Sequence, residues 1–398
     1  MTATAVSPPE PFIRSRTTWL GYALMAYFGF ALSLVGPAMP FIAEKVGLTY
    51  TEMGYHFTLL AVGNLCISLI GDRIARRIGN TSLAWIGVLL IALAFVGVIF
   101  GTTLVMTLTF IFLYGVGIGT LALISINAIA TTKPQFATKA YTEANIGGGA
   151  AMIVGPILFG TLAKTDLGWQ ANALLPLLAL IPVLLIFRGL PLPAQRPPSE
   201  ASPQRTGKAA PLPLMFWLFG VLMILAVAIE WLITSWSTSF LTNVVGYQPS
   251  TSAVLVSVYA AAIVLGRLAG RRLLDLMSEP RLMVVSLIWV LLSFPLYWLG
   301  SVPELNVLGL FLIGLGVGNL APLSMSGAMA AASDARDRAS ARFGIFPSIA
   351  NVTMLQIVGI LADQFGIQNA YIVVPVVVIV AIAMALGTNR IRATQPAK

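Results

Sequence analysis

The 398-residue chain is 58% hydrophobic and only 9% charged, whereas soluble domains carry roughly 25% charged residues. A mean hydropathy of +0.91 excludes a soluble enzyme, because so much apolar surface cannot be hidden inside globular domains. The single cysteine, Cys66, and the single histidine, His56, exclude a disulfide framework and a Cys- or His-rich metal site. We therefore expect a polytopic membrane protein with no metal and no cofactor.

Twelve apolar segments are each long enough to cross the bilayer as a helix. In the first half they are expected at Trp19–Ala43, Glu52–Ile70, Ser82–Phe100, Leu104–Thr131, Ala140–Ala163 and Ala171–Phe187. In the second half they are expected at Leu214–Asn243, Ser252–Leu268, Leu282–Leu299, Leu305–Ala331, Phe343–Leu361 and Tyr371–Leu386. The predicted fold class is an all-α membrane protein with twelve transmembrane helices in two six-helix halves.

The positive charges concentrate on one side of these spans. Of the 23 lysines and arginines, 21 fall at the termini and in the connections that follow even-numbered spans, leaving Lys45 and Lys164 on the opposite side. The positive-inside rule then places both termini in the cytoplasm, and it accounts for the net charge of +9 without a nucleic-acid partner. The first 16 residues lack a cleavable-signal pattern, so we expect the first span to direct membrane insertion.

The expected domain organisation follows the spans: a cytoplasmic tail over 1–16, a six-helix half over 17–189, a Pro-, Ser- and Arg-rich linker over 190–213, a second half over 214–387, and a tail over 388–398. An internal repeat supports this division. GVGIGTLALISI from Gly115 and GLGVGNLAPLSM from Gly314 share six identities in twelve positions at an offset of 199 residues. Parallel repeats are typical of transporters in which one half rocks against the other around a midplane site.

The arrangement resembles the major facilitator superfamily over essentially the whole chain. GDRIARRIGN from Gly71 and GRLAGRRLLD from Gly266 resemble the basic loop motif of that family, GxxxDRxGR, with the acidic position out of register. The resemblance implies a cytoplasmic gate, with Asp334 and Asp337 as hypothetical opposing charges. Arginines that only set the topology are the alternative. The candidate gate residues are Asp72, Arg73, Arg76, Arg77, Arg267 and Arg271.

Glu230 alone among the 14 acidic residues lies well inside a predicted span. A carboxylate in the hydrocarbon costs about 2.5–3.5 kcal/mol on insertion scales, so its presence indicates a function. Thr234 and Ser237 follow at i+4 and i+7 and extend a polar stripe toward an expected aqueous cavity. Glu230 is thus the candidate proton carrier, with a hydrogen-bonded structural glutamate as the alternative. Glu143 is expected to pair with arginines of the loops.

The seventh and eighth spans resemble one branch of this superfamily more closely than the rest of the chain does. Glu230, Trp236, Phe240 and the segment GYQPSTSAVLVSVYAAAIVLGR ending at Arg267 resemble the fucose-permease-like branch, whose members are mostly proton-coupled sugar symporters. The resemblance implies that Glu230 is the coupling acid and Trp236 the aromatic residue of its motif. The acid that this branch carries on its first span is missing here, so an uncoupled facilitator is left open.

Polar and aromatic side chains on the spans are candidates for binding a hydroxylated solute. Interhelical packing is the alternative role for each, and we expect the first, fourth, seventh and tenth spans to line the cavity. The candidate substrate-binding residues are Tyr27, Asn127, Asn145, Trp231, Trp236, Tyr259 and Asn319, with Asn64 and Gln356 as further hydrogen-bonding candidates.

Drug–proton antiporters of the same superfamily are the main alternative. The segment GGGAAMIVGPILFG from Gly147 to Gly160 resembles their glycine motif, although close helix packing also accounts for it. We expect a monomeric secondary transporter in the plasma membrane that binds a small-molecule substrate, protons and the lipid bilayer. A proton-coupled carrier of a sugar-like solute is favoured over efflux by proton antiport. A non-transporting receptor is left open, an enzyme is not expected, and the lack of a P-loop excludes an ATP-driven pump.

Overall fold

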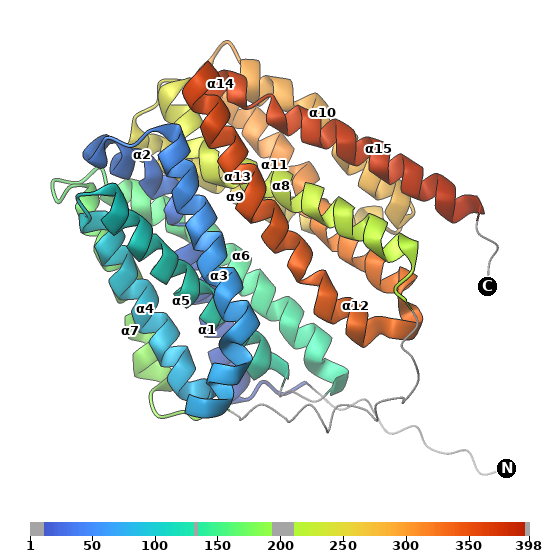
Figure 1. Cartoon of the computed structure of the whole chain (residues 1–398), viewed down its shortest axis with the longest axis horizontal. Coiled ribbons are helices and arrows are strands. Elements are labelled where there is room, and N and C mark those ends of the chain that lie inside the picture. The colour runs from blue at the N-terminus through green and yellow to red at the C-terminus, as the bar shows by residue number, and fades with distance from the viewer. Residues whose placement is uncertain (1–11, 131–133, 193–210, 395–398) are drawn as a thin grey trace.

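The computed structural model describes residues 12–130, 134–192 and 211–394. Within these ranges every regular element is a helix, and twelve spans are long and apolar enough to cross a membrane. The expected fold class of two six-helix halves is confirmed. Figure 1 shows the first half in blue and green beside the second half in yellow to red.

The helices of the first half begin and end close to the predicted spans. They are α1 (Arg16–Leu32), α2 (Val35–Val46), α3 (Tyr50–Ile78), α4 (Asn80–Phe100), α5 (Leu104–Ala130), α6 (Pro134–Leu162), the short helix η1 (Trp169–Leu174) and α7 (Leu175–Phe187). The second half contains α8 (Leu214–Asn243), α9 (Pro249–Leu273), α10 (Glu279–Leu299), α11 (Pro303–Ala331), η3 (Ser333–Ala335), α12 (Arg336–Phe343), α13 (Ile345–Phe365), α14 (Ile367–Ala370) and α15 (Val373–Thr394).

The first span is broken in its middle, whereas one continuous helix over Trp19–Ala43 was expected. The chain turns at Ser33 and Leu34, between α1 and α2. Pro37 has no N–H to donate to the carbonyl of Ser33, four residues earlier, so the helical ladder is interrupted there. The Ser33 hydroxyl instead donates to the carbonyl of Phe30 at 2.8 Å. The break places irregular backbone at the centre of the bundle.

Among the helices that continue past their predicted ends, α3 and α9 carry the basic motifs with them. α3 runs to Ile78 rather than Ile70, and α9 runs to Leu273 rather than Leu268. No proline stands between Ile70 and Gly79, where a φ of +85° ends α3 in a conformation that favours glycine. The arginines expected in loops therefore lie on the last turns of these helices.

The internal repeat corresponds to a repeated pairing of helices. A side chain at Gly314 of α11 would meet the carbonyl oxygen of Tyr259 on α9 at 2.8 Å, and one at Gly115 of α5 would collide with the backbone of Leu60 on α3. Gly115 and Gly314 are 199 residues apart, and so are Leu60 and Tyr259. The small residues of the repeat thus let the same two helices approach closely in each half.

The outer faces of the bundle are apolar. Large side chains such as Leu93, Leu185, Leu292 and Ile379 are exposed on different helices. In a soluble protein a surface of this kind would be an aggregation liability. On twelve membrane-length spans it is the surface that contacts lipid.

The two halves are hydrogen-bonded to each other where α3 begins and α13 ends. The carboxylate of Asp363 accepts the backbone N–H groups of Tyr50 and Thr51, each at 2.8 Å. The Asn243 amide at the end of α8 donates to the Tyr50 hydroxyl at 2.8 Å, and the Gln356 amide donates to the Thr51 carbonyl at 3.3 Å. Figure 1 shows α3 and α13 close together near α2 and α14 and diverging toward α12. We call these contacts the α3–α13 seal.

Candidate functional site

A cavity of about 1160 Å³, counting its opening to solvent, lies between the two halves. Most of its wall is apolar, with side chains that include Phe28, Leu32, Phe57, Leu60, Ile118, Met152, Ile263 and Leu355. The polar and charged side chains on the wall are Ser33, Asn64, Glu230, Trp231, Thr234, Ser235, Tyr259, Arg267 and Asn351. The broken first span contributes Ser33 and the start of α2, so its irregular backbone borders the cavity.

The helices that line the cavity differ from the expected set. α3, α6, α8, α9 and α13 line it together with the first span, while α5 contributes Ile118 and no described residue of α11 is among the lining residues. α11 packs behind α9 through glycines such as Gly314 and Gly318, whose Cα atoms lie against the α9 backbone. The expectation was therefore wrong for the tenth span, which supports the wall from behind α9, whereas the fourth span contributes a single lining residue.

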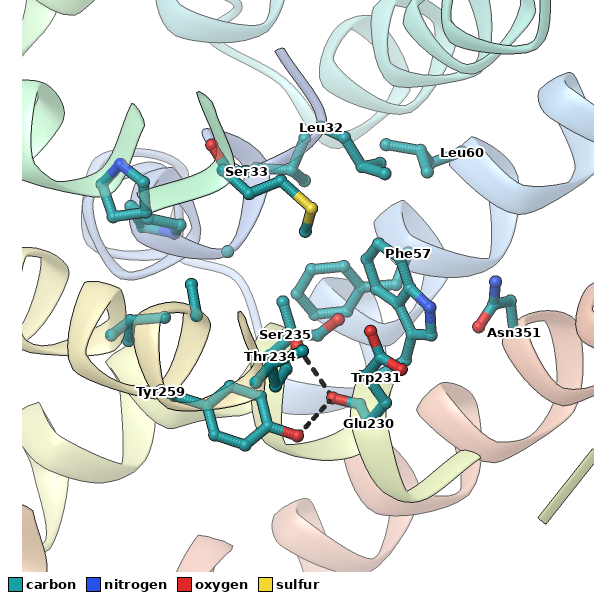
Figure 2. A pocket seen from close by; sticks show the side chains of 18 of the residues that line it. Leu32, Ser33, Phe57, Leu60, Glu230, Trp231, Thr234, Ser235, Tyr259 and Asn351 are labelled. Atoms are coloured by element: carbon teal, nitrogen blue, oxygen red, sulfur yellow. Dashed lines mark hydrogen bonds between the residues drawn. The ribbon is translucent and has the colours of Figure 1, made fainter. Parts of the chain in front are cut away.

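Glu230 lies near the middle of the 30-residue α8 and faces the cavity. Its backbone carbonyl accepts hydrogen bonds from the Thr234 hydroxyl at 2.8 Å and the Tyr259 hydroxyl at 3.4 Å, as Figure 2 shows. Its carboxylate oxygen Oε1 lies 3.8 Å from Nη2 of Arg267, and its side chain is 16% exposed. The backbone carbonyl of Glu230 is thus hydrogen-bonded to two side chains, while its carboxylate faces the guanidinium of Arg267.

Arg267 was expected at a cytoplasmic gate but lies on the cavity wall. Its Nε donates to the Gly318 carbonyl at 3.3 Å, and its side chain is 42% exposed. Tyr259, Ile263 and Arg267 are spaced four residues apart on α9 and share one face. That spacing lies within the predicted span Ser252–Leu268 and was the sequence signal for the place of Arg267.

Of the seven candidate binding residues, Trp231 and Tyr259 line the cavity with Glu230. The other five candidates are not among its lining residues. The Tyr27 hydroxyl donates to the Pro176 carbonyl at 3.0 Å, and Trp236 is fully buried with its ring 5.3 Å from that of Phe57. The remaining three are the amides Asn127, Asn145 and Asn319.

Two of these amides are bonded within their own helices. The Asn145 side chain donates to the Tyr141 carbonyl at 2.8 Å, and the Asn319 side chain donates to the Leu315 carbonyl at 3.5 Å. Asn64 lines the cavity, whereas Gln356 belongs to the α3–α13 seal.

Asn351 on α13 was not recognised from the sequence. It lines the cavity beside Trp231 and Glu230 (Figure 2), and its Oδ1 is buried without a hydrogen-bond partner in the described part of the chain. Its sequence signal was an amide side chain in a mostly apolar helix, which also carries Ser348, Thr353 and Gln356. Asn351 is the polar residue that α13 contributes to the described lining of the cavity, beside Leu355.

The other candidate gate residues lie away from the cavity. Arg271 is exposed near the end of α9. The four charged residues of the GDRIARRIGN motif are exposed near the end of α3, and they are Asp72, Arg73, Arg76 and Arg77. The side chains of Asp334 and Asp337 are outside the part of the chain that the structure describes. The pairing proposed for them stays a prediction.

Glu143 pairs with a terminal arginine, as expected. Nε and Nη2 of Arg14 donate to the two carboxylate oxygens at 2.8 and 2.6 Å, and the Tyr22 hydroxyl donates to the same carboxylate at 2.8 Å. Hydrogen bonding to Glu143 raises the pKa of Arg14, so the guanidinium stays protonated. This cluster fastens the start of α1 to α6 and is separate from the cavity.

The glycine segment from Gly147 to Gly160 packs α6 against its neighbours. Added side-chain atoms at Gly148 would lie 3.3 Å from Met25 of α1, and at Gly149 3.5 Å from Val264 of α9. Gly149 and Pro156 also line the cavity. Close packing accounts for most of the pattern that resembled a drug-antiporter motif.

The comparisons with known proteins agree with this fold. The sequence profile of the Major Facilitator Superfamily matches residues 19–275 and 218–397. The chain therefore belongs to the major facilitator superfamily, a family of solute transporters. A search of curated proteins gave no match.

Several solved structures of transporters are similar in fold. A bacterial homolog of the human lysosomal transporter Spinster, in an inward-facing and unoccupied conformation, has a TM-score of 0.77 and 12% identity over 96% of this chain and 99% of that chain. The nucleoside transporter NupG has a TM-score of 0.74 and 13% identity over 93% of this chain and 99% of that one. A D-xylose–proton symporter has a TM-score of 0.71 and 12% identity over 92% and 96%. At these identities the likeness shows the fold alone.

Proposed function

We propose that the protein is a proton-coupled secondary transporter that moves a small solute across the plasma membrane by alternating access. The observation that carries this proposal is the Glu230–Arg267 pair on the wall of the cavity between the two halves. Placing an acidic residue inside a membrane span costs free energy, so its presence there indicates a function. Glu230 is the group that takes up and releases the proton, and Arg267 is its counter-charge.

The distance within the pair suits this role. At 3.8 Å the two groups attract each other as charges, but they lie beyond the usual length of a charge-assisted hydrogen bond. Protonation of Glu230 removes the negative charge and leaves Arg267 without a counter-charge in a mostly apolar cavity. The charge of the cavity therefore differs between the two protonation states, which is the condition for linking proton binding to solute binding.

The α3–α13 seal supports the alternating-access part of the proposal. It joins the halves at the ends of α3, α8 and α13 that lie opposite α12. With the termini in the cytoplasm, as the positive-inside rule favours, the seal lies on the outer side and the cavity opens inward. Breaking the seal while the other ends close would expose Glu230 to the outside.

The hydrogen-bonding groups of the cavity wall indicate which kind of solute can bind. Three of its hydroxyls are already donated to backbone carbonyls: Ser33 to Phe30, Thr234 to Glu230, and Tyr259 to Glu230. Outside the Glu230–Arg267 pair, the groups left for hydrogen bonding are the amides of Asn64 and Asn351, the Ser235 hydroxyl and the indole N–H of Trp231. A polyhydroxylated sugar would find few partners, so a solute with a large apolar part is favoured over the sugar-like solute expected from the fucose-permease-like resemblance.

Reconstituted liposomes test the function. A pH difference is imposed and the uptake of radiolabelled D-xylose, phenylpropanesulfonate and trimethyl(phenylpropyl)ammonium is measured. The wild type should concentrate one probe class, whereas Glu230→Gln should exchange that probe across the membrane without concentrating it. Glu304→Gln, an exposed acid at the start of α11, is the matched control and should behave as wild type. Accumulation by Glu230→Gln at the wild-type level would contradict the proposal.

A further inference from the structure

Arg267 has hydrogen-bonding capacity that its surroundings leave open. A guanidinium carries five N–H donors in a planar fork. Nε donates to Gly318, while Nη2 is 3.8 Å from the Glu230 carboxylate and the side chain is 42% exposed. A guanidinium with free Nη donors at the edge of an apolar cavity is suited to bind an anionic group in a bidentate way.

The charges on the cavity wall determine when such an anion is accepted. Arg267 and Glu230 are the fully charged side chains among the lining residues, and Tyr259 is the other titratable group that faces Glu230. The lining residues of α2, α3 and α13, which include Gly36, Asn64 and Asn351, carry no titratable group. With Glu230 ionised the pair is neutral and repels no partner, but it also offers an anion no net attraction. With Glu230 protonated, Arg267 is the only charged side chain left among the described lining residues.

We propose that the cargo is an amphipathic organic monoanion whose anionic group binds Arg267, carried together with one proton on Glu230. This inference rests on the proposed function and adds the substrate class to it. The charges balance: the anion neutralises Arg267, the proton neutralises Glu230, and the loaded cavity has no net charge when the halves rearrange in the membrane. Moving an uncompensated charge through an apolar environment would be costly.

The wall also fits the apolar part of such a cargo. Phe57 and Leu60 on α3 and Leu355 on α13 face the cavity together with Trp231, and Figure 2 shows Phe57 and Trp231 near Glu230. Aromatic and aliphatic side chains supply a surface on which an aromatic or aliphatic body is buried, while one charged group fixes its orientation. The anionic end and the apolar body are thus bound by different parts of one cavity.

A binding experiment on the full-length protein in lipid nanodiscs tests this inference. The probes are phenylpropanesulfonate, phenylpropanol and trimethyl(phenylpropyl)ammonium, which share one apolar body and differ in the charge of the head group. The sulfonate and the ammonium keep their charge at all working pH values, so any pH dependence of their Kd reports on the protein. Calorimetry gives the Kd and, in buffers of different ionisation enthalpy, the number of protons taken up.

The inference predicts that the sulfonate binds most tightly, that its Kd rises from acidic to alkaline pH, and that binding takes up a proton at alkaline pH. Arg267→Gln should weaken sulfonate binding by about tenfold or more while leaving phenylpropanol binding unchanged, which shows that the cavity is still folded. Arg272→Gln, which removes an exposed arginine from the same helix, should leave both unchanged. Glu230→Gln should bind the sulfonate at alkaline pH as tightly as the wild type does at acidic pH.

Other results would overturn the inference. The ammonium as the tightest probe would indicate a cation carried in exchange for protons, and equal binding of sulfonate and alcohol would indicate a neutral cargo. A sulfonate Kd unaffected by Arg267→Gln would remove Arg267 from the site. If D-xylose or the ammonium drives Glu230-dependent accumulation in liposomes, the substrate class is wrong and the proposed function stands. The sulfonate could also bind in an Arg267-dependent way while no probe accumulates in a Glu230-dependent way. That result would contradict proton coupling through Glu230, and Arg267 would still be the anion-binding residue.

Discussion

Glu230 and Arg267 depend on each other because each would be an isolated charge without its partner. Their side chains are 16% and 42% exposed, so the pair is neither fully buried nor a surface salt bridge. Removing one member of a buried pair is destabilising, because the other charge is left uncompensated, whereas removing both is far less so. Thermal unfolding of the single and double variants can separate the two effects.

We predict that Arg267→Gln lowers the free energy of unfolding by about 1–2 kcal/mol, reduced from the fully buried case because the guanidinium is partly solvated. The Glu230→Gln/Arg267→Gln double variant should be more stable than the sum of the single effects by about 1 kcal/mol. Strictly additive effects of the two substitutions would show that the pair is not energetically coupled. The measurement is a double-mutant cycle in detergent or nanodiscs.

The sequence identified Glu230 but missed Arg267 and Asn351 as cavity residues, and the reasons are physical. A lone acid in an apolar span stands out by its transfer cost. Arg267 lies near the end of its predicted span, where an arginine also satisfies the positive-inside rule. Its presence there therefore did not indicate that it shares a helix face with Tyr259 and lines the cavity. Asn145 and Asn319 were predicted to bind solute, but an amide in a helix can also bond to its own backbone four residues earlier.

Among the helices, α3 and α13 depend on the Asp363 carboxylate for their contact. It accepts two backbone N–H groups at the first turn of α3, where the orphan donors and the helix dipole favour a negative charge. A bond of this type between the two halves stabilises the sealed conformation without any covalent or metal link.

We predict that Asp363→Asn weakens the seal by about 1 kcal/mol and shifts the population toward the conformation open at that end by about five- to tenfold. Labelling of Ser235→Cys, which lines the cavity, by an impermeant maleimide added from the outside should become faster. Cys66 is exposed and is first replaced by alanine. Asp166→Asn, an exposed aspartate after α6, is the control. Unchanged labelling in Asp363→Asn would show that the carboxylate does not hold the seal.

The approach of α11 to α9 depends on Gly314. A side chain there would meet the Tyr259 carbonyl at 2.8 Å and the Ala262 side chain at 2.7 Å. We predict that Gly314→Val destabilises the protein by about 1–3 kcal/mol through overpacking. Gly147→Val on α6 has the same change in helix propensity but meets nothing within 4 Å, so it should cost less. Equal losses of thermal stability in the two variants would contradict the packing argument.

The spans were predictable because about 20 apolar residues are needed to cross the hydrocarbon, and the repeat was predictable because its glycines meet equivalent backbone atoms in both halves. The break in the first span was not predicted, although Pro37 was visible, because hydropathy alone does not distinguish a broken helix from a continuous one. The extension of α3 beyond Ile70 was missed because charged residues were taken as the end of the helix.

For the whole molecule, the hydrogen bonds of the seal and the cavity together describe one conformation of a transport cycle. The halves meet at the ends of α3 and α13, while Glu230 lies on a cavity between them. Alternating access requires these contacts to break in each cycle. Fixing them covalently should therefore stop transport while leaving the fold intact.

We predict that a disulfide between Thr51→Cys and Asp363→Cys, in the Cys66→Ala background, abolishes transport, and that a reducing agent restores it. The Thr51 amide is 2.8 Å from the Asp363 carboxylate, so the two positions are close enough to be joined after small adjustments. Each single-cysteine variant should transport at the same rate before and after oxidation, because it cannot form the cross-link. Full transport by the cross-linked protein would show that these helix ends do not separate during the cycle.

Proton movement through Glu230 is the central claim, and solute-driven proton flux measures it most directly. Liposomes containing a pH-sensitive dye and the purified protein are mixed with phenylpropanesulfonate, D-xylose or trimethyl(phenylpropyl)ammonium. The account predicts that one of these probes acidifies or alkalinises the lumen with wild type and Glu304→Gln but not with Glu230→Gln. A solute-driven pH change of the same rate in Glu230→Gln would contradict the account, because the protons would then cross by another route.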